Sequence, residues 1–156
     1  MDEKINTLRT IYQHRDMVRI CLKRISTDLD MRGLNHDLSK LSEDEFEGFS
    51  RINNIARKYP YGSKEYKESL KKERDTIDLH YSRNRHHPEH WSDVRGMGYL
   101  DIIEMVCDWY AATNTYKQTE LSTVLDKQFE RFNFSDEQKW LIKEIWSDLT
   151  YKEIFE

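Results

Sequence analysis

The sequence predicts an all-α fold. Only five Gly and two Pro occur among 156 residues, which is too few for the many turns that short strands need. Apolar residues recur at helical spacing, and a sustained alternation of apolar and polar residues is absent from the sequence. A chain of this length fits one domain with one core. We therefore expect a single helical bundle of about six to seven helices over residues 1–156.

The N-terminal part predicts three helices. The first, about 2–26, has one apolar stripe and a second that places His14 on its core side. A short helix at about 27–34 precedes the dipeptide His36-Asp37. Ser42 and Glu45 form a capping box, so a third helix begins there and ends near residue 58. The first stripe consists of Ile5, Leu8, Tyr12, Leu22 and Ile25.

The rest of the chain predicts four more helices. Ser63 is the expected N-cap of the fourth, about 64–84, and residues 85–98 are expected to be irregular because of Pro88 and two glycines. The fifth spans about 99–117. The C-terminal segment, 119–156, is expected to hold helices at about 120–132 and 136–149, the last capped by Ser135 with Gln138. The core stripe of the last helix is Trp140, Leu141, Ile145 and Leu149.

Charge and apolar content exclude several classes of function. The net charge of −4 lacks the basic excess that binds duplex nucleic acid. A signal peptide and an apolar run of membrane-spanning length are both missing, so we expect no membrane partner. Cys21 and Cys107 have no CxxC spacing and lie at apolar positions, which predicts buried free thiols. Together these features favour a cytoplasmic protein.

The histidines are clustered in a way that predicts a metal site. Imidazole and carboxylate both bind divalent transition metals. Asp108 lies on a largely apolar helix, where a carboxylate is costly to bury unless it is paired or metal-bound. His80 and His87 share a helical face if the fourth helix persists. Any one of these side chains alone is more simply a core or surface residue, but their order favours a shared site. The six histidines are His14, His36, His80, His86, His87 and His90.

This order resembles the HD-domain superfamily of metal-dependent phosphohydrolases. The run from His36 to Lys40 is similar to that family's HDxGK element, with Ser39 where Gly is usual. His14, His36, Asp37 and Asp108 match the four basic metal ligands in order. His80, His86 and His87 look like the additional ligands of the two-metal branch. The motifs, which cover residues 14–109 and include His86-His87-Pro88-Glu89-His90-Trp91, also look like a small family of phage and bacterial HD-like proteins.

The resemblance implies a phosphohydrolase that acts on a nucleotide or another small phosphate ester. One or two ions of Mn, Fe, Co, Ni or Zn would activate water, with Asp37 as the bridging and catalytic carboxylate. Lys40 is placed to contact a substrate phosphate, or is an ordinary surface lysine. Arg83 and Arg85 offer further positive charge. Glu104 is expected to orient a histidine N–H, and His90 to support the loop. Glu45 could transfer protons or support a ligand, although its capping box already explains it.

Two other functions fit the same residues. The first is an oxygenase with two irons, because some HD-like proteins oxidise substrates with dioxygen. The second is a non-catalytic binding module in which Trp140, Trp146, Tyr151 and Phe155 form a partner surface. We favour the simpler explanation that these aromatic residues cover the core or form a contact in a homodimer.

Overall fold

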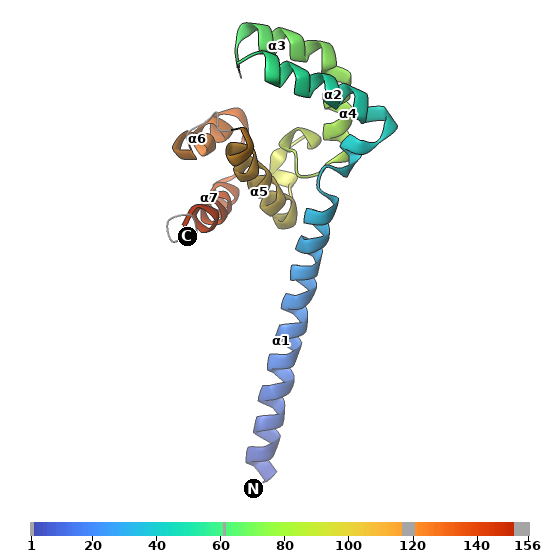
Figure 1. Cartoon of the computed structure of the whole chain (residues 1–156). Coiled ribbons are helices and arrows are strands. Elements are labelled where there is room, and N and C mark those ends of the chain that lie inside the picture. The colour runs from blue at the N-terminus through green and yellow to red at the C-terminus, as the bar shows by residue number, and fades with distance from the viewer. Residues whose placement is uncertain (1, 61, 117–120, 152–156) are drawn as a thin grey trace. The chain divides into compact units, whose positions relative to one another are not determined.

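The computed structural model confirms the all-α fold class (Figure 1). It describes residues 2–60, 62–116 and 121–151, and this part of the chain contains no strand. The α-helices are α1 (Asp2–Asn35), α2 (Glu43–Lys58), α3 (Lys64–Leu70), α4 (Arg74–Arg83), α5 (Tyr99–Tyr116), α6 (Leu121–Arg131) and α7 (Asp136–Tyr151). Short 3₁₀ helices are η1 (Leu38–Leu41), η2 (Lys71–Glu73), η3 (Pro88–His90) and η4 (Val94–Gly96).

The chain divides into two compact units. The first is Met1–His36 and the second is Asp37–Glu156. The first unit consists of α1, and the second contains the other helices. The single domain expected over residues 1–156 stays a prediction.

The first unit corrects the expected helix boundaries. We predicted two helices, about 2–26 and 27–34, but α1 is one helix of 34 residues. Thr27 does not cap a new helix. Its hydroxyl donates to the carbonyl oxygen of Lys23 at 2.9 Å, one turn back, as threonine does inside a helix. His14 is exposed, so its expected place on a core side of this helix is wrong.

The core of the second unit forms where α5 packs on α7, with α6 contributing Val124. Gln138, Ile142 and Trp146 recur every fourth residue along the buried face of α7. Of the predicted core stripe, Leu141, Ile145 and Leu149 pack against this core, but Trp140 is 64% exposed. The ring of Trp146 packs against that of Tyr110, with their centroids 5.8 Å apart. The buried apolar residues are Met97, Ile102, Met105, Val106, Val124, Phe134, Ile142 and Trp146.

Helix starts were predicted better than helix lengths. The Ser63 hydroxyl accepts the backbone N–H of Tyr66 at 3.1 Å, as expected of an N-cap. The predicted helix 64–84 is interrupted by η2, because the chain tightens to 3₁₀ geometry between α3 and α4. The capping box of α7 is confirmed by reciprocal bonds between Ser135 and Gln138. Ser42 precedes α2 as predicted, but makes no side-chain capping bond.

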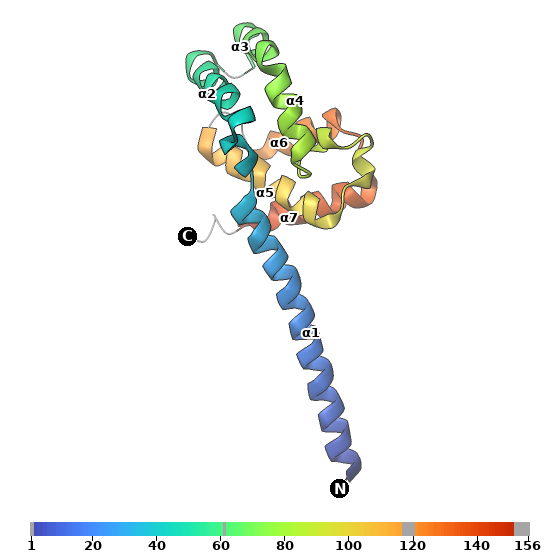
Figure 2. The same cartoon turned by 90° about the vertical axis from the view of Figure 1, so that its right-hand side faces the viewer.

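A close antiparallel contact joins α2 to the segment formed by η2 and α4 (Figure 2). A Cβ atom added to Gly48 would lie 2.1 Å from Oγ1 and 2.5 Å from Cγ2 of Thr76. One turn away on α2, Arg51 pairs with Glu73 at 2.9 Å. In the other direction, Glu45 meets His80. The absent side chain of Gly48 thus sets how closely these helices approach.

The exposure of the cysteines and the apolarity of the helices can be compared with the sequence predictions. Cys21 and Cys107 are free thiols, but both are exposed, so the expected burial is wrong. Within the described ranges, the helices lack the combination of length and apolarity that a membrane crossing needs.

We predict that Gly48→Ala destabilises the protein by about 1–3 kcal/mol, because the added methyl group overpacks against Thr76. Thermal unfolding would measure the loss. Gly33→Ala is the control, since a Cβ there meets nothing within 4 Å and helix propensity favours Ala by about 1 kcal/mol. Adding Thr76→Ala should restore part of the lost stability. Additive losses in the double variant would contradict the proposed contact.

Candidate functional site

The backbone of Asp37 turns the chain into the candidate site. Its φ of 56° and ψ of 14° lie in the left-handed region, which Asp tolerates better than most residues. The turn of η1 closes behind it, with the Lys40 N–H donating to the Asp37 carbonyl at 2.9 Å. Among the described non-glycine residues, Asp37 alone has a positive φ. Such strain persists where the surroundings fix it and is concentrated at functional sites.

Three imidazoles converge on one carboxylate oxygen. Oδ1 of Asp37 lies 3.1 Å from Nε2 of His80, 3.4 Å from Nε2 of His86 and 4.0 Å from Nε2 of His87. Nε2 of His80 is also 3.0 Å from Nε2 of His87. His80 lies in the last turn of α4, which ends at Arg83, and the segment that follows carries His86 and His87. Four side chains that the sequence analysis selected as ligands are thus brought together.

Two glutamates contact the Nδ1 atoms of His80 and His86, on the side of each ring away from Asp37. Oε2 of Glu45 is 2.8 Å from Nδ1 of His80, and Oε1 of Glu104 is 3.1 Å from Nδ1 of His86. A carboxylate accepts a proton on Nδ1 and so leaves Nε2 as the acceptor nitrogen of the neutral ring. Both rings therefore turn Nε2 toward Asp37. The expected role of Glu104 fits this contact, and Glu45 takes the orienting role instead of capping α2.

A buried network fixes Glu45 in turn. Its side chain is fully buried, accepts from the Ser39 hydroxyl at 2.9 Å and pairs with Nη1 of Arg83 at 3.1 Å. Asn84 donates to the Ser39 hydroxyl and to the His80 carbonyl, each at 2.8 Å. At the position where the HD element usually has Gly, the Ser39 hydroxyl therefore links Glu45 to Asn84. These four supporting contacts were not foreseen from the sequence.

The charges of the site favour cation binding. Burial opposes ionisation of Asp37, but hydrogen bonds from His80 and His86, in the form that carries a proton on Nε2, and from Lys40 outweigh it and hold the pKa of this carboxyl well below its usual range. Burial, aided by repulsion from His86 and His80, lowers the pKa of His87 to about 3. At neutral pH the site therefore presents an anionic carboxylate and a neutral His87 ring, the forms that bind metals.

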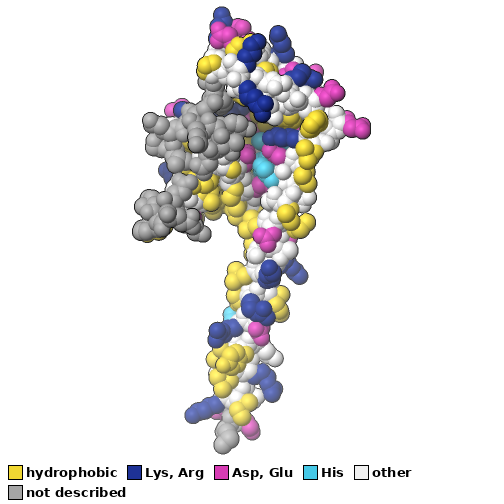
Figure 3. Space-filling model, viewed as in Figure 1, with side chains coloured by type: hydrophobic (Ala, Val, Ile, Leu, Met, Phe, Trp, Pro, Cys, Tyr) yellow, Lys and Arg dark blue, Asp and Glu magenta, His cyan; other side chains and the backbone are white. Residues whose placement is uncertain are grey.

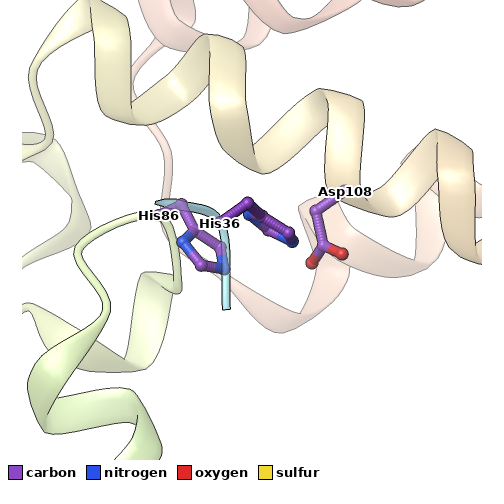
Figure 4. A group of neighbouring side chains, drawn as sticks. All are labelled: His36, His86 and Asp108. Carbon is purple, nitrogen blue, oxygen red and sulfur yellow. The ribbon is translucent and has the colours of Figure 1, made fainter. Parts of the chain in front are cut away.

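The side chains form two groups with ligand atoms within 4.8 Å of one another. The first is Asp37, His80 and His87, and the second is His36, His86 and Asp108. Figure 4 shows the second group, with Asp108 projecting from α5. His36 is the last residue of the first unit and is bonded directly to Asp37. The second unit alone supplies the other five side chains.

The donor set fits a divalent transition metal. With Nδ1 of His80 and His86 facing carboxylates, the lone pairs of their Nε2 atoms point toward the anionic oxygen of Asp37. Like lone pairs at 3.1–3.4 Å repel unless a proton or a cation lies among them. Imidazole and carboxylate ligands suit Mn, Fe, Co, Ni and Zn. Histidine, acidic and basic side chains also gather on one exposed face of the second unit (Figure 3).

A family model matches residues 3–153 and is described as a family of unknown function, DUF5662. The chain belongs to the DUF5662 family. The match spans both candidate ligand groups. No curated protein and no solved structure matches the chain.

His14 is the expected ligand of this DUF5662 chain that the structure does not bring to either group. It lies within α1, whose continuous geometry places it about 33 Å along the helix axis from His36. The resemblance to the HD superfamily placed these residues on one ion, but α1 continues without a break between His14 and Asn35. The structure thus leaves the expected set of seven ligand residues with six.

The remaining predicted residues support other parts of the unit. Arg83 pairs with Asp44 at 2.8 Å and with Glu45. Arg85 pairs with Asp101 at 3.1 Å. His90 contacts the backbone carbonyl of Tyr81 at 3.0 Å, which fits its expected role in loop packing.

Glu45→Gln should weaken metal binding about 10–100-fold, the usual effect of losing an orienting carboxylate. Its amide keeps the size of the side chain but removes the charge that holds the Nδ1 proton of His80. Calorimetric titration with Zn²⁺ or Mn²⁺ would measure the affinity. Asp44→Asn is the matched control, because it also loses a contact with Arg83 but does not touch His80. Equal affinities in the two variants would refute the orienting role.

Proposed function

We propose that the chain is a metal-dependent phosphohydrolase of the HD type, acting on a nucleotide or another small phosphate ester. The observation that carries the proposal is the convergence of three Nε2 atoms on Oδ1 of Asp37. Two of the three rings are held from behind by carboxylates, the arrangement typical of metal-binding histidines. The His-Asp pair with its later histidines and Asp108 supports the resemblance to the HD superfamily.

Asp37 lies between the two ligand groups and is suited to bridge them. Its Oδ1 faces His80 and His86, which belong to different groups. A carboxylate has two oxygens, so it can serve one cation with each. A divalent ion held there would polarise a phosphoryl oxygen and lower the pKa of a coordinated water to near 7.

The chain's own residues supply orientation and charge. The buried network behind His80 restricts the movement of that ring, so the site keeps its geometry without reorganisation. Lys40 places an ammonium beside Asp37, and its side chain is 36% exposed, so it can reach a substrate anion from the solvent side. A phosphoryl group bound between these residues would have positive charge on both sides as its own charge develops.

Asp37→Asn should abolish hydrolysis of phosphate monoesters and reduce metal content to background. Asn also tolerates a left-handed backbone, so the fold should be retained. A panel of nucleoside monophosphates and sugar phosphates, assayed for released phosphate, would test activity. Asp78→Asn is the control, since Asp78 is exposed and pairs only with Arg74 in the contacts described.

The same assays separate the proposal from its alternatives. Phosphatase activity that survives Asp37→Asn would refute it. Bound iron with oxygen consumption and no phosphate release would favour the two-iron oxygenase. Bound metal without turnover on the panel would favour a binding module.

We expect two ions per chain, one at each ligand group. His87→Gln should remove one ion and leave the group with His86 and Asp108 loaded, whereas Asp108→Asn should do the reverse. Elemental analysis of protein purified without chelator would count the ions. A content of one ion, lost equally in either variant, would contradict two separate positions.

A further inference from the structure

Lys40 is bound to the carboxylate on which the metal ligands converge. Its Nζ lies 2.5 Å from Oδ2 of Asp37, while Oδ1 of the same carboxylate faces the histidines. The ammonium also lies 4.8 Å from the ring centroid of Phe49, on α2. Lys40 therefore occupies the second oxygen of the candidate bridging ligand.

The other two cations near the site are committed elsewhere. Arg83 is shared between Asp44 and Glu45. Arg85 pairs with Asp101, and its guanidinium lies 4.4 Å from the ring of Trp91. Neither pairing involves a member of the two ligand groups. The Lys40 pairing does, so metal binding must alter it.

An ammonium and a divalent cation compete for one carboxylate. A cation on Asp37 draws its negative charge away from Lys40 and repels the ammonium, because like charges a few ångströms apart cost free energy. The repulsion is relieved when an anion lies between the two positive groups. A tetrahedral oxyanion is well suited, because one oxygen can face the metal position while another accepts from the ammonium.

We propose that Lys40 is a metal-coupled latch for a phosphate group. Without metal it pairs with Asp37, and with metal it is released to bind a terminal phosphate, so metal binds first and substrate second. This inference rests on the proposed function and adds its ligand class, a phosphate monoester, and its order of binding. It requires that removing the charge of Lys40 strengthens metal binding and weakens phosphate binding.

Lys40→Gln should bind Mn²⁺ roughly threefold to fivefold more tightly in phosphate-free buffer, because a competitor for Asp37 is gone. The same variant, once loaded with Mn²⁺, should bind inorganic phosphate about tenfold more weakly, because a charge-assisted hydrogen bond is lost. Calorimetric titrations with Mn²⁺, and then with phosphate, measure both effects without a turnover assay. Wild-type protein should bind phosphate at least about tenfold more weakly before metal is added.

Lys40→Arg should restore phosphate binding, because it keeps the cation. Lys64→Gln is the matched control: it removes an exposed lysine whose recorded partner is Glu68, and it should change neither affinity. Unchanged or weaker Mn²⁺ binding in Lys40→Gln would overturn the latch, as would phosphate binding that does not depend on metal. Both results leave the phosphohydrolase proposal intact. Failure of the wild-type protein to bind Mn²⁺, Zn²⁺ or Fe²⁺ would instead refute the proposed function itself.

Discussion

The arrangement of the candidate site depends on the close approach of α2 and α4 at Gly48. Without a side chain there, Thr76 can press against the backbone of α2, and the two helices lie near enough for short side chains to meet. One turn toward the site, this closeness lets Glu45 reach His80 at 2.8 Å. A wider spacing would separate a fully buried carboxylate from its histidine, which is costly for both groups. The packing of α2 against α4 at Gly48 thus also determines the contact between Glu45 and His80.

The two histidine–glutamate pairs differ in how firmly they are held. Glu45 is fully buried and has contacts with Ser39 and Arg83 in addition to His80. Glu104 is 14% exposed. Water competes for an exposed carboxylate more than for a buried one, so the ring of His80 is the more rigidly oriented of the two. The position beside His80 is therefore the better preorganised half of the site.

The sequence was sufficient for the fold class and for most of the site. Helical spacing and few turn residues predicted an all-α chain, and the order of histidines and aspartates selected six residues that the structure gathers. Local capping rules found Ser63 and Ser135, because these hydrogen bonds act within a few residues. Such rules could not decide the role of Glu45, because its choice between the α2 N-terminus and His80 depends on a residue 35 positions away in the sequence.

The errors in the length of α1 and in the buried face of α7 also arise because local sequence rules do not include tertiary contacts. Whether a helix continues past Thr27 depends on small differences in propensity, which the sequence pattern does not resolve. The expected position of His14 came from an apolar stripe on this helix and from the HD resemblance, and the stripe residues of α1 are exposed. Which face of α7 is most deeply buried depends on the side that α5 offers, so Ile142 and Trp146 were missed and Trp140 was wrongly placed in the core. Tertiary contacts, rather than local preference, determine these features.

The left-handed backbone of Asp37 has a consequence for reading other members of the family. The turn and the ligand place separate demands on this position. The turn accepts Asn and Gly as readily as Asp, whereas metal binding needs the carboxylate. If the proposed metal site is correct, a relative without the metal could keep the fold by substituting Asn or Gly here, and few other residues would serve. The identity of this single residue in a related chain would then distinguish members that can form the proposed site from those that keep only the scaffold.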